Sequence, residues 1–113
     1  MQYLLLIYED EKRFDQGFDP AEMGQYQAFG QKHGAAIKGG NALQPTTTAK
    51  TVRVRNGSSA GTDGPFAETK EQLGGYYLVE AKDLDTALGI AARIPGARSG
   101  SVEVRPVWVY DET

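Results

Sequence analysis

Residues 62–77, Thr-Asp-Gly-Pro-Phe-Ala-Glu-Thr-Lys-Glu-Gln-Leu-Gly-Gly-Tyr-Tyr, separate two halves of the chain that differ in pattern. The stretch opens on turn chemistry at Asp63–Pro65. Here an aspartate bonds readily to nearby backbone, a glycine is pushed to extended geometry by the next residue, and a proline fixes its own φ. Charged residues follow, and Gly74 and Gly75 lead into an aromatic strand. The stretch therefore joins a hairpin to a strand–helix–strand unit.

The C-terminal half predicts strand, helix and strand. Residues 75–81 alternate, which puts Tyr77, Val79 and Ala81 on one face and Tyr76, Leu78 and Glu80 on the other. Asp83 is placed to cap a helix that Pro95-Gly96 ends. The apolar face of this helix comprises Leu84, Ala87, Leu88, Ala91 and Ile94. Residues 101–109 are the last strand, with Val102 and Val104 opposite Ser101, Glu103 and Arg105.

The N-terminal half predicts a strand and a helix. Residues 2–8 are an apolar run typical of a buried strand, with Tyr3, Leu5 and Ile7 on one face. The charged residues 9–18 predict a loop. Asp19, Pro20 and Glu22 form a capping-box start for a helix. Its stripe is Met23, Tyr26, Gly30, His33 and Ile37, and Gly39-Gly40 are expected to end it.

Residues 41–62 predict an exposed hairpin. A short extended piece at 41–45 and a loop at 46–48 precede residues 51–55, which alternate as a strand. Asn56-Gly57 is the favoured two-residue hairpin turn, and the returning residues 58–62 are poor in apolar side chains. The element order predicts one α+β domain over residues 1–113, a ferredoxin-like βαββαβ fold with an inserted β-hairpin.

One face of the expected sheet has no helix to cover it. It carries Leu4, Leu6, Tyr8, Tyr76 and Leu78 beside Glu80, Glu103, Arg105 and Arg53. A sheet face with this many large apolar residues is poorly suited to water, and pairing two such faces about a two-fold axis buries them. The pattern therefore predicts a homodimer.

Composition narrows the classes of function. The chain has 113 residues, a net charge of −3, no cysteine and one histidine. The acidic balance argues against a nucleic-acid partner, and the missing cysteines exclude disulfides and thiol chemistry. Neither a metal nor another cofactor is expected. The apolar N-terminal run is too short to span a membrane and has no basic leader, so we expect no membrane partner and a cytoplasmic location.

Asp63-Gly64-Pro65-Phe66, followed by residues 68–76, resembles the DGPF signature of the YCII-related family. The resemblance continues through residues 39–40, 42–45, 51–55 and 100–106, and so covers nearly the whole chain. It implies a dimeric α+β barrel, whose interior can hold a small pocket. Some dimeric barrels of this superfamily are lactone isomerases, dehalogenases or monooxygenases that work without metals.

The resemblance leaves three functions open. The first is binding of a small anionic molecule in the barrel pocket, with cofactor-independent acid–base catalysis as its enzymatic form. The second is a regulatory protein partner without catalysis, because DGPF proteins are similar to domains and neighbours associated with extracytoplasmic-function sigma factors. The third is a dimeric scaffold with no present-day chemistry.

Asp63 is the first candidate catalytic residue. It is interpreted either as a general base or polar anchor at the barrel mouth, or as an acceptor of backbone hydrogen bonds that shapes its turn. His33 is the weaker candidate. Other YCII-like branches are thought to use a His–Asp pair, but their histidine sits differently relative to the helix start. A structural role for His33 on the helix stripe is the alternative to proton transfer.

Arg53, Arg105, Tyr8 and Tyr76 are the candidate substrate-binding residues. The arginines suit a carboxylate, and the tyrosines could line a pocket or donate a proton. Each also has a plainer interpretation. The arginines can be solvated or paired with acidic residues across the sheet, and the tyrosines can be interface aromatics.

Overall fold

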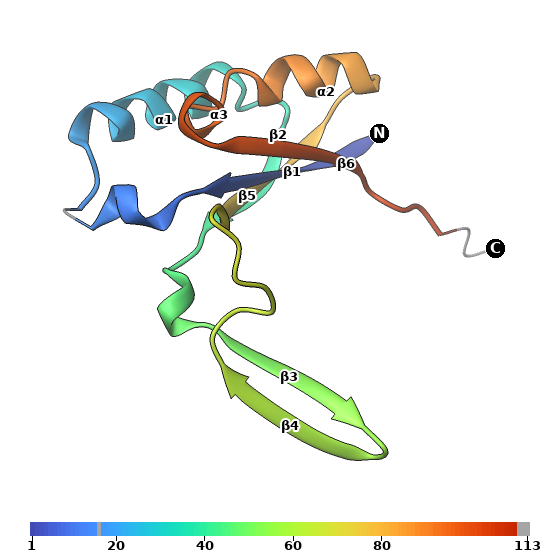
Figure 1. The fold of residues 1–113 in the computed structure, drawn as a ribbon. Helices are drawn as coiled ribbons and strands as arrows, with labels where there is room; N and C mark the ends of the chain where they lie inside the picture. The colour runs from blue at the N-terminus through green and yellow to red at the C-terminus, as the bar shows by residue number, and fades with distance from the viewer. Residues whose placement is uncertain (16, 111–113) are drawn as a thin grey trace.

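A computed structural model describes residues 1–15 and 17–110 of the chain (Figure 1). The elements in chain order are β1 (Gln2–Glu9), the 3₁₀ helix η1 (Glu11–Phe14), α1 (Pro20–Lys32), β2 (Ile37–Ala42), the 3₁₀ helix η2 (Thr46–Thr48), β3 (Lys50–Arg55), β4 (Ser58–Asp63), β5 (Gln72–Glu80), α2 (Leu84–Ala91), α3 (Gly96–Ser99) and β6 (Ser101–Pro106).

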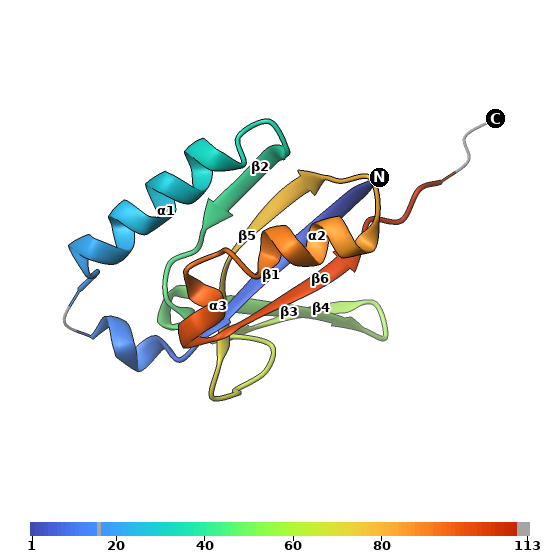
Figure 2. The same ribbon diagram turned by 90° about the horizontal axis from the view of Figure 1, so that it is seen from above.

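Four strands form an antiparallel sheet in the order β2-β5-β1-β6, and β3 and β4 form a separate two-stranded sheet. This order is that of a ferredoxin-like βαββαβ unit with the β3–β4 hairpin inserted before its third strand, which confirms the predicted fold. All the helices labelled α1, α2 and α3 lie over one face of the four-stranded sheet (Figure 2). Among residues 1–15 and 17–110, no helix covers the other face (Figure 1).

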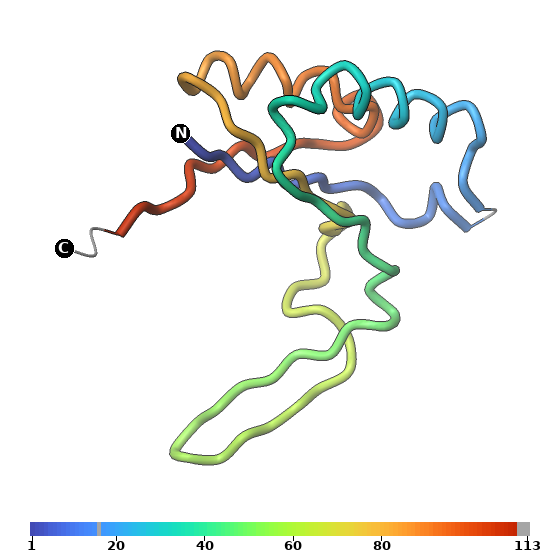
Figure 3. The backbone as a smooth tube through the Cα atoms, turned by 180° about the vertical axis from the view of Figure 1, so that it is seen from behind, coloured from blue at the N-terminus to red at the C-terminus, as the bar shows by residue number. Residues whose placement is uncertain are grey.

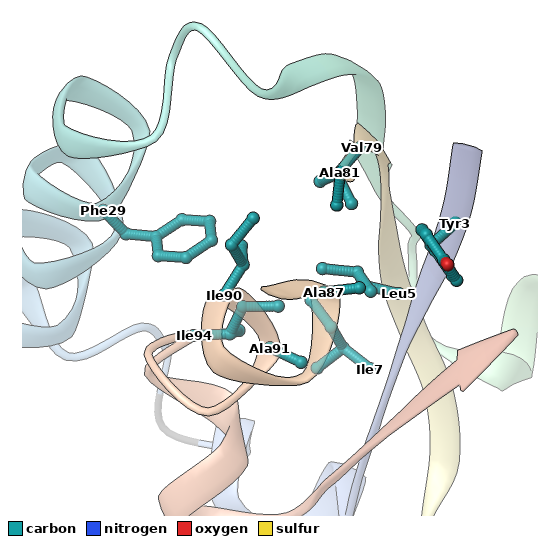
Figure 4. Packing of buried hydrophobic residues seen from close by; sticks show 10 residues of the cluster. All are labelled: Tyr3, Leu5, Ile7, Phe29, Val79, Ala81, Ala87, Ile90, Ala91 and Ile94. Atoms are coloured by element: carbon teal, nitrogen blue, oxygen red, sulfur yellow. The ribbon is translucent and has the colours of Figure 1, made fainter. Parts of the chain in front are cut away.

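The core fills the space between the helices and the sheet (Figure 4). Its buried members are Tyr3, Leu5, Ile7, Phe29, Val79, Ala81, Ala87, Ile90, Ala91 and Ile94. The predicted inward strand faces are confirmed, because alternation holds through β1 and β5. The predicted helix face is partly wrong: Leu84 and Leu88 are each 46% exposed. Ile90 takes an inward position instead, because the buried stripe runs through residues 87, 90, 91 and 94, which have the same helical spacing as the predicted stripe but lie on a neighbouring side of the helix.

The first helix ends earlier than predicted. α1 stops at Lys32, with His33 as its C-cap, and the two glycines at 39 and 40 belong to β2. A Cβ on Gly40 would lie only 2.6 Å from the carbonyl oxygen of Tyr76. Gly40 therefore allows β2 to approach β5 closely, and it is not a helix stop. Ile37, predicted on the helix stripe, pairs with Val79 of β5 instead.

The predicted loop over residues 9–18 is partly wrong, because Glu9 and residues 11–14 form regular structure. Glu9 completes β1, and η1 follows directly with Asp10 as its N-cap. At the other end of the chain, β6 stops at Pro106, three residues before the predicted end. Proline cannot donate a ladder hydrogen bond, which favours the earlier end.

The β3–β4 hairpin extends away from the four-stranded sheet (Figure 3). Asn56 and Gly57 have φ values of 53° and 78°, as the predicted turn requires. Val52 and Val54 are 66% and 59% exposed, so the predicted exposure of the hairpin is confirmed. The radius of gyration is 16.2 Å, whereas a compact chain of this length is expected to have a radius of gyration of about 13 Å. The hairpin is thus a projecting arm with little support from its own chain.

Candidate functional site

A cleft of about 810 Å³ lies between α1, η1 and the β2–β5 side of the sheet. Much of its wall is apolar, from Phe14, Phe18, Met23, Tyr26, Leu43 and Tyr77. We call it the α1 cleft. Its volume and lining are typical of small-molecule sites. A second hollow, of about 400 Å³, is lined by polar and charged side chains including Asp10, Lys12 and Lys70, and it lacks such a wall.

Glu9 is the buried charged residue of the α1 cleft. It is only 7% exposed, because it continues the inward alternation of Tyr3, Leu5 and Ile7 along β1. Its Oε1 accepts hydrogen bonds from Arg13 Nη1 at 3.0 Å and Ser99 Oγ at 2.8 Å. A buried carboxylate requires such partners. Arg13 lies in η1, four residues after Glu9, and this short helical turn brings its guanidinium to the Glu9 carboxylate.

Arg13 joins two carboxylates from different elements. Its Nη2 lies 2.9 Å from Glu22 Oε2, and its Nη1 lies 3.3 Å from Glu22 Oε1. The hydrogen bond to Glu22 raises the pKa of Arg13, and the negative charge of Glu9 adds to the effect against the opposing influence of burial. The guanidinium therefore stays charged and ties β1 to the first turn of α1.

Tyr26 brings a hydroxyl to the same place. Its oxygen accepts a hydrogen bond from the Gly96 backbone N–H at 3.2 Å. Burial raises the pKa of Tyr26 to about 12, and the nearby charge of Glu9 adds to the effect. The phenol is thus protonated at neutral pH. A Cβ placed on Gly96 would lie 2.8 Å from the Tyr26 oxygen and 2.9 Å from Glu9 Oε1, so the two oxygens converge on one point.

The structure places Asp63 outside the α1 cleft. Its side chain is 88% exposed, at the end of β4, and pairs with Lys50 Nζ at 2.5 Å. The next residue, Gly64, has a φ of 98°. This positive φ differs from the negative φ of ordinary extended backbone, and glycine reaches it without steric cost. The Gly64 N–H donates to the Ala49 carbonyl at 2.7 Å, which ties this turn to the base of the hairpin.

The fold does not bring His33 close to Asp63. It caps the C-terminus of α1, above the four-stranded sheet in Figure 1, whereas β4 lies below that sheet. Its ring packs on Phe29 with centroids 4.9 Å apart, and its Nε2 is buried with no partner among the described residues. Burial lowers the pKa of His33, and the positive charges of Arg93 and Lys32 lower it further. These surroundings favour a neutral imidazole.

The four predicted substrate-binding residues are dispersed. Arg53 lies on the projecting hairpin. Tyr8 and Arg105 share Glu103 on the open sheet face, at 3.4 Å from the Tyr8 hydroxyl and 3.5 Å from Arg105 Nε. Tyr76 is also on the open face, but it borders the α1 cleft, which is lined by both Tyr76 and Tyr77 of β5. Its hydroxyl accepts a hydrogen bond from Asn41 Nδ2 at 2.9 Å.

Sequence reasoning missed Glu9, Arg13 and Tyr26 as site residues. Glu9 and Arg13 lie in the charged run taken as a loop, and Tyr26 was assigned only to the helix stripe. One signal was present: extending the alternation of β1 by two residues beyond Ile7 places Glu9 on the inward face. Nothing in the local sequence indicated that Ser99 and Gly96 would meet it there.

The fold and cleft define a ferredoxin-like α+β protein with room for a small molecule. The chain belongs to the YCII-related domain family, which matches residues 1–111. It is 41% identical over 117 residues to the uncharacterized protein R00369 of Rhizobium meliloti (strain 1021), an alignment that covers 97% of this chain and 94% of that protein.

A solved structure shares the fold. It is 5-chloro-2-hydroxyhydroquinone dehydrochlorinase from Burkholderia phenoliruptrix AC1100, in complex with 2,5-dihydroxybenzoquinone. The TM-score is 0.58 at 13% identity, covering 99% of this chain and 97% of the neighbour. Within residues 1–15 and 17–110, no helix is long and apolar enough to cross a membrane, and no group of three or more acidic or histidine side chains is arranged to hold a metal ion.

Proposed function

We propose that this protein is a homodimer that binds a small organic molecule in the α1 cleft. The observation that carries the proposal is the buried Glu9 carboxylate against a mostly apolar wall in a cleft of about 810 Å³. Burying a charge costs stability unless it is well paired, and a few placed polar groups against an apolar wall are typical of small-molecule sites. The structural neighbour, a complex with 2,5-dihydroxybenzoquinone, adds support at the level of fold.

The enzymatic form of the proposal is acid–base catalysis without a cofactor. Asp63, the base predicted from the sequence, lies on the arm and outside its own cleft. It can reach a bound molecule only if the arm of one subunit extends to a site on its partner. The Asp63→Asn variant tests this role: binding or turnover that survives unchanged removes Asp63 from the site.

The homodimer is proposed from the open face of the sheet. This face carries the half-buried side chains of Leu4, Leu6, Tyr8, Tyr76 and Leu78. No helix in the part of the chain that the structure describes lies over them. Pairing the face with a second copy removes this apolar area from water and also surrounds the Tyr8–Glu103–Arg105 cluster.

Light scattering on the purified protein tests the dimer. We expect a mass of about twice the 12.3 kDa of one chain. Leu6→Glu places a charge in the centre of the open face and should give a folded monomer or a strongly weakened dimer. Leu88→Glu, on the partly exposed side of α2, is the matched control and should stay dimeric. A wild-type monomer at high protein concentration contradicts the proposal.

Binding is tested by a thermal-shift screen of small aromatic and carboxylate compounds, followed by amide chemical-shift mapping. A ligand at 100 times its dissociation constant stabilises the folded state by about 2.7 kcal/mol. Shifts concentrated in η1, α1 and β2 support the α1 cleft. Shifts concentrated around Tyr8 and Arg105 instead move the site to the open sheet face and favour the anionic ligand predicted from the sequence. No ligand of either class favours the regulatory alternative.

A further inference from the structure

One acceptor oxygen and one donor hydrogen in the α1 cleft are unused in the part of the chain that the structure describes. The hydrogen bonds to Glu9 both engage Oε1, and none engages Oε2. The Tyr26 oxygen accepts from Gly96, but its own hydrogen is donated to no described residue. Glu9 and Tyr26 both line the cleft. A strong acceptor and a donor are therefore available side by side at a mostly apolar wall.

The partners of Glu9 hold its carboxylate in place. Arg13 arrives from η1 and Ser99 from α3, and both donate to Oε1. A carboxylate fixed through one oxygen has its second oxygen directed by the geometry of the group. Gly96 keeps the space beside both oxygens clear, because a Cβ there would lie within 3.0 Å of Glu9 Oε1 and the Tyr26 oxygen. The acceptor and donor are thus positioned before any ligand arrives.

The charge of the lining selects against an anion. The ionisable groups along the cleft are tyrosines and the carboxylates of Glu9, Glu11, Asp19 and Glu22, and no lysine, arginine or histidine lines it among the described residues. The nearby Arg13 already serves Glu9 and Glu22. An anionic ligand would therefore lose its hydration and be repelled by these carboxylates. An uncharged molecule avoids both costs.

We infer that the α1 cleft recognises an uncharged ring that bears hydroxyl groups. One ligand hydroxyl donates to Glu9 Oε2, and the Tyr26 hydroxyl donates to a ligand oxygen, while the ring packs on the apolar wall. The inference rests on the proposed function and adds the chemical class of its ligand. Selectivity follows because a ring without a hydroxyl leaves Glu9 Oε2 desolvated and unpaired, which is more costly than the net value of the bond itself.

The experiment compares three probes of similar size by isothermal titration calorimetry at pH 7. Resorcinol carries two hydroxyls, 1,3-dimethoxybenzene has the oxygens without donors, and benzoate carries a negative charge. We expect resorcinol to bind at least about tenfold more tightly than either of the others, as the loss of one hydrogen bond to a charged group predicts. Glu9→Gln and Tyr26→Phe should each reduce this preference for resorcinol.

Two control variants remove the same functional groups, a carboxylate and a phenol hydroxyl, at positions outside the α1 cleft. Glu68→Gln removes a carboxylate on the exposed loop, and Tyr3→Phe removes a core hydroxyl outside the cleft. Both should retain the preference for resorcinol. Tyr26→Phe keeps the inference testable if Glu9→Gln unfolds the protein, because it leaves the Glu9–Arg13–Ser99 contacts intact.

The outcomes separate the inference from the proposed function. Equal binding of resorcinol and 1,3-dimethoxybenzene in the α1 cleft, or tighter binding of benzoate there, overturns the inference and leaves the small-molecule function standing. A preference for resorcinol that Tyr26→Phe does not reduce also overturns it. Failure of all three probes, together with failure of the wider screen, overturns both.

Discussion

Gly96→Ala is the substitution that most directly tests how the α1 cleft is built. Gly96 opens α3, where the chain passes beside the ends of the Glu9 and Tyr26 side chains. An added Cβ would lie 2.8 Å from the Tyr26 oxygen, 2.9 Å from Glu9 Oε1 and 2.9 Å from Ile7 Cγ2. One methyl group therefore intrudes on both polar groups of the cleft and on the core strand beneath them.

The magnitude follows from these three contacts. Each is about 0.5 Å shorter than ordinary contact, which begins near 3.4 Å. The two oxygens end flexible side chains and can move, but the β-branched Ile7 is restricted at χ1 and 7% exposed. Overpacking of this kind costs about 1–2 kcal/mol, which lowers the Tm of a domain of this size by about 5–10 °C. Displacement of Glu9 and Tyr26 should also weaken resorcinol binding.

The assay is thermal unfolding followed by calorimetric titration, with Gly89→Ala as the matched control. Gly89 lies within α2, where an added Cβ meets nothing within 4 Å, so alanine there should stabilise the protein by about 0.5–1 kcal/mol through helix propensity. If Gly96→Ala melts at or above the wild-type Tm and binds resorcinol with wild-type affinity, the described convergence at Gly96 is refuted.

Two further predictions concern stability. The pKa of His33 is lowered in the folded state, so the unfolded chain takes up this proton first and stability falls as pH decreases below about 6.5. Stability is measured as the urea concentration at the unfolding midpoint. The decrease of this midpoint between pH 7.5 and 5.5 should be smaller in His33→Phe than in the wild type. An equal decrease would contradict a buried neutral imidazole. Asp83 Oδ1 accepts from the Thr86 N–H at 2.8 Å and hydroxyl at 2.7 Å, which lowers the pKa of Asp83. Asp83→Ala should therefore lower the Tm at pH 7. The difference in Tm between the variant and the wild type should shrink below pH 3.8, the ordinary pKa of an aspartate. Equal Tm values at pH 7 would show that the cap does not stabilise α2.

Much of the fold is predictable from local chemistry. The two-residue alternation of β1 and β5 assigns their buried faces, and Asn56-Gly57 specifies the hairpin turn. Asp19 and Asp83 accept hydrogen bonds at the starts of α1 and α2, as predicted. These features depend on neighbours a few residues apart, so the sequence alone contains what is needed to place them.

The wrong predictions concern features that depend on contacts between segments far apart in the sequence. Gly39-Gly40 resembled a helix end, because glycine is common there, but the approach of β5 requires glycine at position 40 of β2. Asp63 has turn chemistry and a distinctive motif, yet the structure places it on an exposed arm with Lys50. No local pattern specifies whether an arm folds back, projects or meets a second chain.

The sequence by itself determined the βαββαβ order, the buried strand faces, the exposed hairpin and the family. The tertiary structure alone decided the cleft, because Glu9, Arg13, Tyr26 and Ser99 come from β1, η1, α1 and α3 and meet only after the chain has folded. A carboxylate nine residues from the N-terminus becomes a buried acceptor through contact with a serine 90 positions later. Alternation along β1 can point Glu9 inward, but only packing between distant elements supplies the partners that keep its charge there.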